Sequence, residues 1–111
     1  INGLQNETIK LASMQTIGLG HIQNIGATYV LSVGVAHIVN IGMTQKTNVG
    51  QSISMHAGKT VVIEAGETLV LKAGKSTLTM DSDGNIELNG NKIHIAGDTV
   101  VDIDSKLIDL N

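Results

Sequence analysis

Two histidines are the side chains best suited to hold an ion in this sequence. His21 and His37 are sixteen residues apart, and each stands three places after a glycine. The same place is taken by Tyr29 between them and by Gln45 beyond them. Converging imidazole nitrogens can hold a metal ion or water, so His21 and His37 are candidates for an axial ion or water site if several chains meet there. The preferred interpretation is structural histidine in early repeats that tilt differently, because Ile22, Val30 and Ile38 in the adjacent column are apolar. No metal site is predicted.

The segment Asp81–Gly84, DSDG, resembles a piece of a calcium-binding loop. It lacks the further acidic positions and the closing glutamate of an EF-hand. We therefore interpret it as a turn, one that ends the repeat pattern described below.

The remaining polar residues do not form a catalytic set. Acidic residues near the C-terminal end alternate with apolar residues and fit the solvent-exposed face of a strand; they are Asp102, Asp104 and Asp109, with Ser105 among them. No nucleophile, base and orienting group stand out together. The sequence predicts neither an enzyme nor a cofactor.

The composition excludes several classes of partner. The net charge is -3, with seven lysines and no arginine, which argues against a nucleic-acid surface. There is no cysteine and one aromatic residue, Tyr29, so the core must come from aliphatic side chains. No apolar run is long enough for a membrane span or typical of a signal peptide. Because the chain begins with Ile1, we expect a processed protein or a fragment.

An eight-residue repeat organises these residues. The repeat glycines are Gly18, Gly26, Gly34, Gly42, Gly50, Gly58, Gly66 and Gly74. The place before each glycine is always apolar, and it forms the predicted core column together with three inward residues of later repeats. This core column is Ile17, Ile25, Val33, Ile41, Val49, Ala57, Ala65, Ala73, Met55, Ile63 and Leu71. Such a period is the signature of a repeat architecture.

Within each octad the pattern predicts a short strand and a bend. Apolar and polar residues alternate in the later repeats, as in VVIEAG and LVLKAG, and period two is typical of a strand. We expect the glycine to turn the chain, either by a positive φ or by close backbone approach. The predicted divisions are residues 1–80, the octad β-helix, and residues 81–111, an irregular β-strand end.

Geometry favours three chains around one axis. Eight residues as a complete turn would give a perimeter of about 27 Å, too thin for sheets that pack about 10 Å apart. If each octad is one face, the interior holds one packed layer. The expected fold is therefore all-β, an intertwined triple-stranded β-helix, or trimeric β-prism needle. A single-chain solenoid with three octads per turn remains open; it would have only about three turns, near the minimum for a repeat stack.

Most of the chain resembles a known family. The tandem LxLxAGxS units, the run IGLGHIQNIGATYVLSVGVAHIVNIG and the closing KSTLTMDSDGNIELNGNKIHIAG resemble the C-terminal region of valine-glycine repeat (VgrG) spikes of type VI secretion. The likeness covers roughly residues 9–97. It implies a homotrimeric needle that is secreted through a contractile apparatus and punctures a target membrane. It also implies a PAAR-type tip protein or effector at the C-terminal end, and an N-terminal region, outside these residues, that docks on the tube.

Two alternatives follow from the same pattern. Contractile phage spikes share the eight-residue period, so a phage stalk or puncturing spike is the first. A monomeric β-solenoid that binds ice or polysaccharide is the second. Its ligand array would be the small hydroxyl residues next to the bends, namely Thr28, Thr44, Ser52, Thr60 and Thr68.

Overall fold

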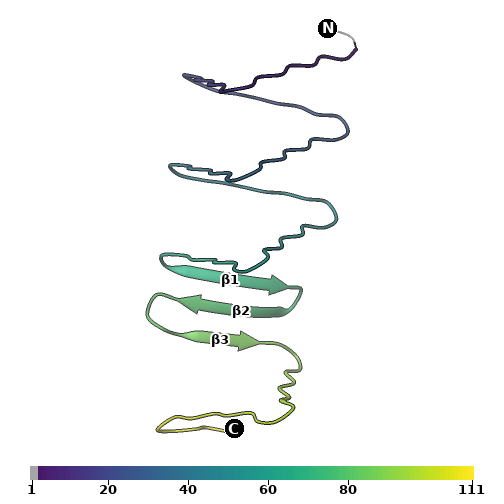
Figure 1. The fold of residues 1–111 in the computed structure, drawn as a ribbon. Helices are drawn as coiled ribbons and strands as arrows, with labels where there is room; N and C mark the ends of the chain where they lie inside the picture. The colour runs from purple at the N-terminus through teal and green to yellow at the C-terminus, as the bar shows by residue number, and fades with distance from the viewer. Residues whose placement is uncertain (1–2) are drawn as a thin grey trace. The chain divides into compact units, whose positions relative to one another are not determined.

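The chain is all-β in the computed structural model, which describes residues 3–111. Strands β1 (Thr68–Ala73), β2 (Ser76–Asp81) and β3 (Ile86–Asn89) form one open antiparallel sheet in the order β1-β2-β3 (Figure 1). The described residues contain no helix, and so none that is long and apolar enough to cross a membrane. The chain divides into two units, Ile1–Asn48 and Val49–Asn111, and all three strands belong to the second.

A two-residue hairpin joins β1 to β2. Ala73 pairs with Ser76, so Gly74 and Lys75 make the connection. Gly74 has a φ of 57°, whereas Lys75 has no positive φ, a combination that fits a type II′ turn. This turn matches the right-handed twist of two antiparallel strands, and the chain therefore folds back on itself here.

A loop built around Asp81 joins β2 to β3. The amide of Gly84 donates to the Asp81 carbonyl at 3.2 Å, and the amide of Asp81 donates to the Asn85 carbonyl at 3.1 Å. Gly84 has a φ of 90°. This is the pattern of a three-residue hairpin loop, a turn followed by a glycine bulge. The prediction that DSDG forms a turn is confirmed.

The strands have one apolar face and one polar face because alternate side chains point to opposite sides. On one face Leu71, Leu78 and Leu88 lie opposite one another across the three strands. On the other face Thr79 lies between Val70 of β1 and Glu87 of β3. The apolar face comprises Leu69, Leu71, Ala73, Ser76, Leu78, Met80, Ile86 and Leu88. The polar face comprises Thr68, Val70, Lys72, Thr77, Thr79, Asp81, Glu87 and Asn89.

Outside the sheet the chain consists of extended segments separated by bends. The seven repeat glycines from Gly18 to Gly66 each lie at a bend. Bends or turns also occur where there is no repeat glycine. They lie at Lys10, Ser82, Asn91, Asp98 and Lys106. Bends therefore recur beyond the DSDG turn at intervals of seven to nine residues, contrary to the expectation that this turn ends the pattern.

Of the two expected reasons for the repeat glycines, a positive φ holds only for Gly74, and close backbone approach is not found within the chain. Among the described residues a positive φ occurs at Gly3, Gly74 and Gly84 alone. A Cβ added to any repeat glycine would meet no atom of the chain within 4 Å. From Gly18 to Gly66, then, neither backbone conformation nor crowding within the chain requires glycine.

Replacing Gly74 with Ala is expected to destabilise the β1–β2 hairpin, because a side chain in the left-handed region costs about 1 kcal/mol or more. Thermal unfolding followed by circular dichroism should show a lower midpoint for Gly74→Ala. The control is Lys75→Ala, in the same loop but without a positive φ, which should leave the midpoint nearly unchanged. Equal effects of both substitutions would contradict the assigned turn.

Candidate assembly surface

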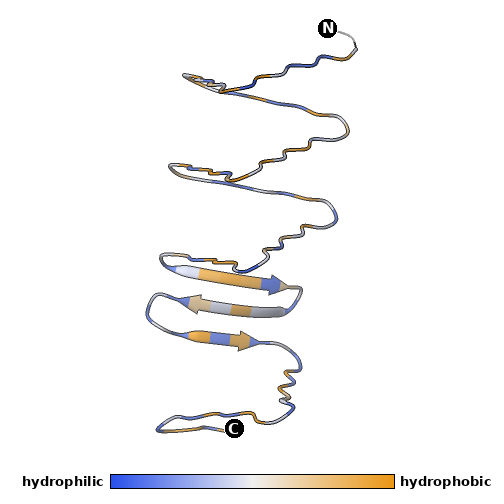
Figure 2. Ribbon diagram, in the orientation of Figure 1, coloured by the Kyte–Doolittle hydropathy of each residue, from blue (hydrophilic) through white to orange (hydrophobic). Residues whose placement is uncertain are grey.

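The single chain has no core. None of the described residues is buried, and only Leu69 and the four residues from Thr77 to Met80 are even half-buried. Hydrophobic residues are nevertheless spread along the whole chain rather than gathered in one segment (Figure 2). Each extended segment thus presents apolar side chains that nothing in the chain covers.

The exposed area is far too large for a folded monomer. The chain has an accessible surface of 12233 Å² at a mass of 11.6 kDa. A folded monomer of that mass exposes about 5,800 Å² and a fully unfolded chain about 16,800 Å². The excess over a folded monomer is about 6,400 Å². Obligate interfaces bury about 2,000 to 5,000 Å² or more counted over both partners, so the excess on this one chain is larger than what one such interface takes from a single subunit.

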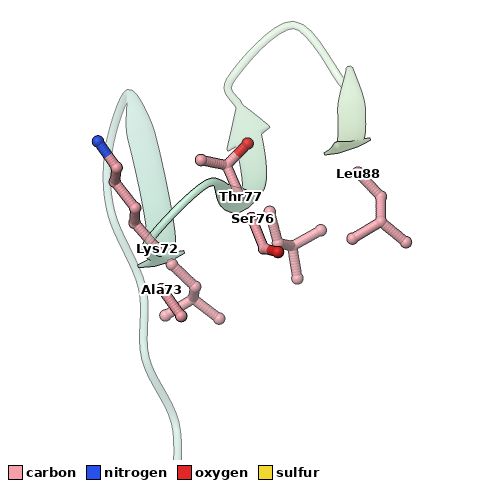
Figure 3. Close-up of a pocket in the computed structure, with 7 residues that line it drawn as sticks. Lys72, Ala73, Ser76, Thr77 and Leu88 are labelled. Carbon is pink, nitrogen blue, oxygen red and sulfur yellow. The ribbon is translucent and has the colours of Figure 1, made fainter. Parts of the chain in front are cut away.

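The apolar face of the sheet is the best-defined part of this uncovered surface. Leu71, Leu78 and Leu88 form its central row, with Ala73 and Ser76 beside them. In Figure 3 Lys72 and Thr77 extend to one side of the sheet, while Ala73, Ser76 and Leu88 lie on the other. Leu71 is 52% exposed and Leu88 is 53% exposed although they occupy the middle of an apolar face. A sheet of three strands needs such a face to be covered for stability.

Several residues of the predicted core column lie on the less exposed side of their octads, although Met55 is 75% exposed and Leu71 is as exposed as Val70, at 52%. Ile17 and Ile25 are 44% and 45% exposed, whereas Ile22, on the opposite side of the same octad, is 87% exposed. Ile63 and Val62 differ in the same direction, at 60% and 78%. Because no other chain is present, these differences arise from the chain's own neighbours. They agree with the predicted separation into two faces, while burial of the core column stays a prediction.

The histidines are not gathered into a site. His21, His37, His56 and His94 are all exposed. Within the part of the chain that the structure describes, no three His, Asp or Glu side chains are close enough to hold a metal ion. A site on an axis would need the same histidine from several chains, and it stays a prediction.

Asp81 is the most highly connected polar side chain. Its Oδ1 accepts from the amides of Asp83 and Asn85, both at 3.0 Å, and its Oδ2 accepts from Asn85 Nδ2 at 3.1 Å. These bonds, those from Asn85 first, hold the pKa of Asp81 below its usual 3.8 although the residue is exposed. The carboxylate therefore works as a local brace for the loop, since its acceptor positions are occupied by the loop itself.

The acidic C-terminal segment shows no catalytic arrangement. Asp102, Asp104 and Asp109 are exposed, and the Ser105 hydroxyl accepts a hydrogen bond from the Leu107 amide at 3.4 Å. That bond is local to the chain and orients no general base toward the serine. The prediction that the protein is not an enzyme stays a prediction.

Two features of the chain differ from what the octad pattern predicts. The pattern predicts one more bend at Gly74, whereas the chain reverses there, and the Gly-Lys pair between two alternating segments is itself a hairpin signal. The pattern also does not predict the bracing role of Asp81. An Asp followed by a Gly three places later is a signal for such a loop, because aspartate side chains accept from backbone amides just ahead of them.

Comparison with protein-family models finds no match to the chain, and comparison with curated proteins finds none either.

The Asp81 loop should make the protein sensitive to acid. Because the folded pKa is depressed, Asp81 contributes stability above the unfolded value near 3.8, and that contribution is lost as the pH falls through the lower folded value. Thermal midpoints measured from pH 7 to pH 2 should fall less steeply below pH 4 for Asp81→Asn than for the unchanged protein. Asp83→Asn is the matched control in the same loop and should keep the original steepness. A profile unaltered by Asp81→Asn would contradict the bracing role.

Proposed function

We propose that the chain is one strand-forming subunit of a homotrimeric, intertwined β-helical needle, the puncturing spike of a type VI secretion apparatus of the VgrG kind. In this proposal three copies wind around one axis, and each octad supplies one face. The interior is made by the predicted core column, and function is mechanical: a stiff rod that carries a tip protein or effector into a target cell.

The observation that carries the proposal is the lack of internal pairing between octads. Apart from the strand ladders of residues 68–89, the described chain has only three backbone hydrogen bonds, and all three belong to the Asp81 loop and its contact with Glu67. The extended segments from residue 10 to residue 66 therefore have unpaired amides and carbonyls. Buried backbone groups are almost always paired, so strands in a packed rod need partners from other chains.

The repeat glycines support the same proposal. Nothing inside the chain prevents a side chain at Gly18 or Gly66, yet glycine recurs there at every eighth residue. Close approach of a neighbouring chain at each corner of a prism is a reason for glycine that acts only in the assembly.

The sheet of β1, β2 and β3 adds a region that pairs within one chain. Three copies of its apolar face, directed toward one axis, would enclose a closed core of leucine and methionine. Because strands of a closed rod pair all the way around the axis, the octad region would have no exposed strand edge. Exposed strand edges are sites of aggregation. Many short strands without long loops also share an axial load. This is the mechanical property that a puncturing needle requires.

The likeness of the sequence to VgrG spikes supplies the biological part of the proposal. It suggests delivery through a contractile apparatus, a PAAR-type tip protein or effector at the C-terminal end, and no binding of nucleic acid. A phage tail spike or stalk would use the same trimeric rod, and no structural feature separates it from a type VI spike.

The monomeric solenoid is less well supported. A solenoid of one chain needs hydrogen bonds between octads of successive turns, and the described residues outside 67–89 have no backbone hydrogen bonds. The array of Thr28, Thr44 and Thr60 beside the bends would then have no rigid lattice on which to bind ice or polysaccharide.

The first test is the absolute mass in solution. Light scattering on the purified chain should give three times 11.6 kDa, unchanged after mild heating in detergent. A trimer that dissociates readily would argue against intertwined chains, and a monomer with a β-type circular dichroism spectrum would contradict the proposal and favour the solenoid.

A pair of neighbouring substitutions tests which side of the octad faces inward. Ile63→Asp should abolish trimer formation, because three unpaired carboxylates would be buried at one level at a cost of several kcal/mol each. Val62→Asp, one residue earlier and on the opposite side, should still give trimers. A native trimer of Ile63→Asp would show that the inward assignment is wrong.

A further inference from the structure

The octad repeat leaves the register between neighbouring chains weakly specified. If one chain of the proposed trimer slips by eight residues, each repeat glycine of that chain takes the place of another repeat glycine. From Ile17 to Val49 the place before the glycine holds only isoleucine or valine, so the slip exchanges similar side chains in the predicted core column. An even shift also keeps every side chain on its own face of the strand. The octads alone therefore allow several registers of similar stability.

The sheet of residues 68–89, which we call the meander, does not share this equivalence. Strand β2 (Ser76–Asp81) comes one octad after β1 (Thr68–Ala73) in the sequence, but it runs in the opposite direction. A chain that slipped by one octad would place β2 where the other two chains have β1. Its strand would then have the wrong direction, and its turn at Gly74 would lie at the wrong level. Of the registers that the octads allow, only one lets three meanders match residue for residue.

The meander is also the part of the chain that comes nearest to folding by itself. Its strands pair within one chain through short loops, and its residues Leu69 and Thr77 to Met80 are the only half-buried ones in the part of the chain that the structure describes. Such hairpins form within microseconds, whereas contacts between chains wait for an encounter. The octads from residue 10 to residue 66 have no backbone hydrogen bond within the chain. The meander can therefore form before another chain arrives, and the octads cannot.

The apolar face of the meander fits further copies of itself. No residue of this face is charged, and Leu71 and Leu88 are about half exposed on it. The opposite face has three charged residues, namely Lys72, Asp81 and Glu87. Leu71 and Ala73 also belong to the predicted core column, so the apolar face continues the interior of the proposed trimer. A polar partner would leave these side chains uncovered, whereas two further copies place leucine against leucine.

We propose that the meander starts the assembly of the trimer and sets its register. Each meander folds within its own chain, and three of them join through their apolar faces. This contact fixes the level at which an octad of one chain meets the octads of the other two, and the octads then wind from a defined starting point. The inference rests on the trimer proposed above, to which it adds an order of formation.

Two matched variants test the order of assembly. The meander variant replaces the central leucines with threonine, which is compatible with a strand, and carries Leu71→Thr, Leu78→Thr and Leu88→Thr. The octad variant changes three core residues in the same way and carries Ile17→Thr, Ile25→Thr and Val33→Thr. Each chain is unfolded in guanidinium chloride and diluted, and its mass and circular dichroism are followed with time. The meander variant should assemble at least tenfold more slowly than the unchanged chain. The octad variant should assemble within twofold of the unchanged rate and dissociate faster, because its contacts form after the rate-limiting step.

A nitroxide label tests the register itself. The chain has no cysteine, so Asn48→Cys accepts a single label on the polar side of an octad, and pulsed electron paramagnetic resonance measures the distances between the labels of one trimer. In one register the three labels are equivalent and give a single distance. A chain that slipped by one octad would bring its label onto the face of another chain and add a second, much shorter distance. We expect a single distance in the unchanged trimer and in the octad variant, and both distances in any trimer of the meander variant.

The possible outcomes separate this inference from the proposed function. Unchanged assembly and a single distance in the meander variant would overturn the inference, because the apolar face would then be covered by a different partner or by another part of the chain. An equal slowing of both variants, or two distances in the unchanged trimer, would overturn it as well. A meander variant that stays monomeric while the octad variant forms trimers would support it. If the unchanged chain is itself monomeric, the proposed function is contradicted instead.

Discussion

The need of every extended backbone group for a partner is the constraint on which the rest of this structure depends. A strand satisfies its amides and carbonyls only through a neighbouring strand, and the octads from residue 10 to residue 66 have no neighbour within their own chain. The same segments leave their apolar side chains uncovered. In the proposed trimer, other chains laid alongside would supply both the missing hydrogen bonds and the missing cover.

Residues 68–89 differ because their hydrogen bonds are local. The turn at Gly74 and the loop braced by Asp81 return the chain onto itself, so three strands pair without help from another chain. Even here the apolar side chains are not buried, since Leu71 and Leu88 in the central row of the apolar face are about half exposed. Backbone pairing and side-chain burial are thus separated in this protein: the first is achieved locally in one region, and the second is achieved nowhere within a single chain.

The sequence by itself determined the all-β class, the eight-residue spacing up to Gly74, the turn at Asp81–Gly84 and the alternation of faces along strand β1. These depend on interactions between near neighbours: alternation along a strand, and the preference of aspartate and glycine for particular turns. Only the tertiary structure decided that the chain reverses at Gly74, that bends recur as far as Lys106, and that glycine from Gly18 to Gly66 has no cause within the chain. A bend after which the chain continues and a turn that reverses the chain are formed by the same residue types. They differ in φ and in strand pairing, and both depend on the segments that lie beside the chain.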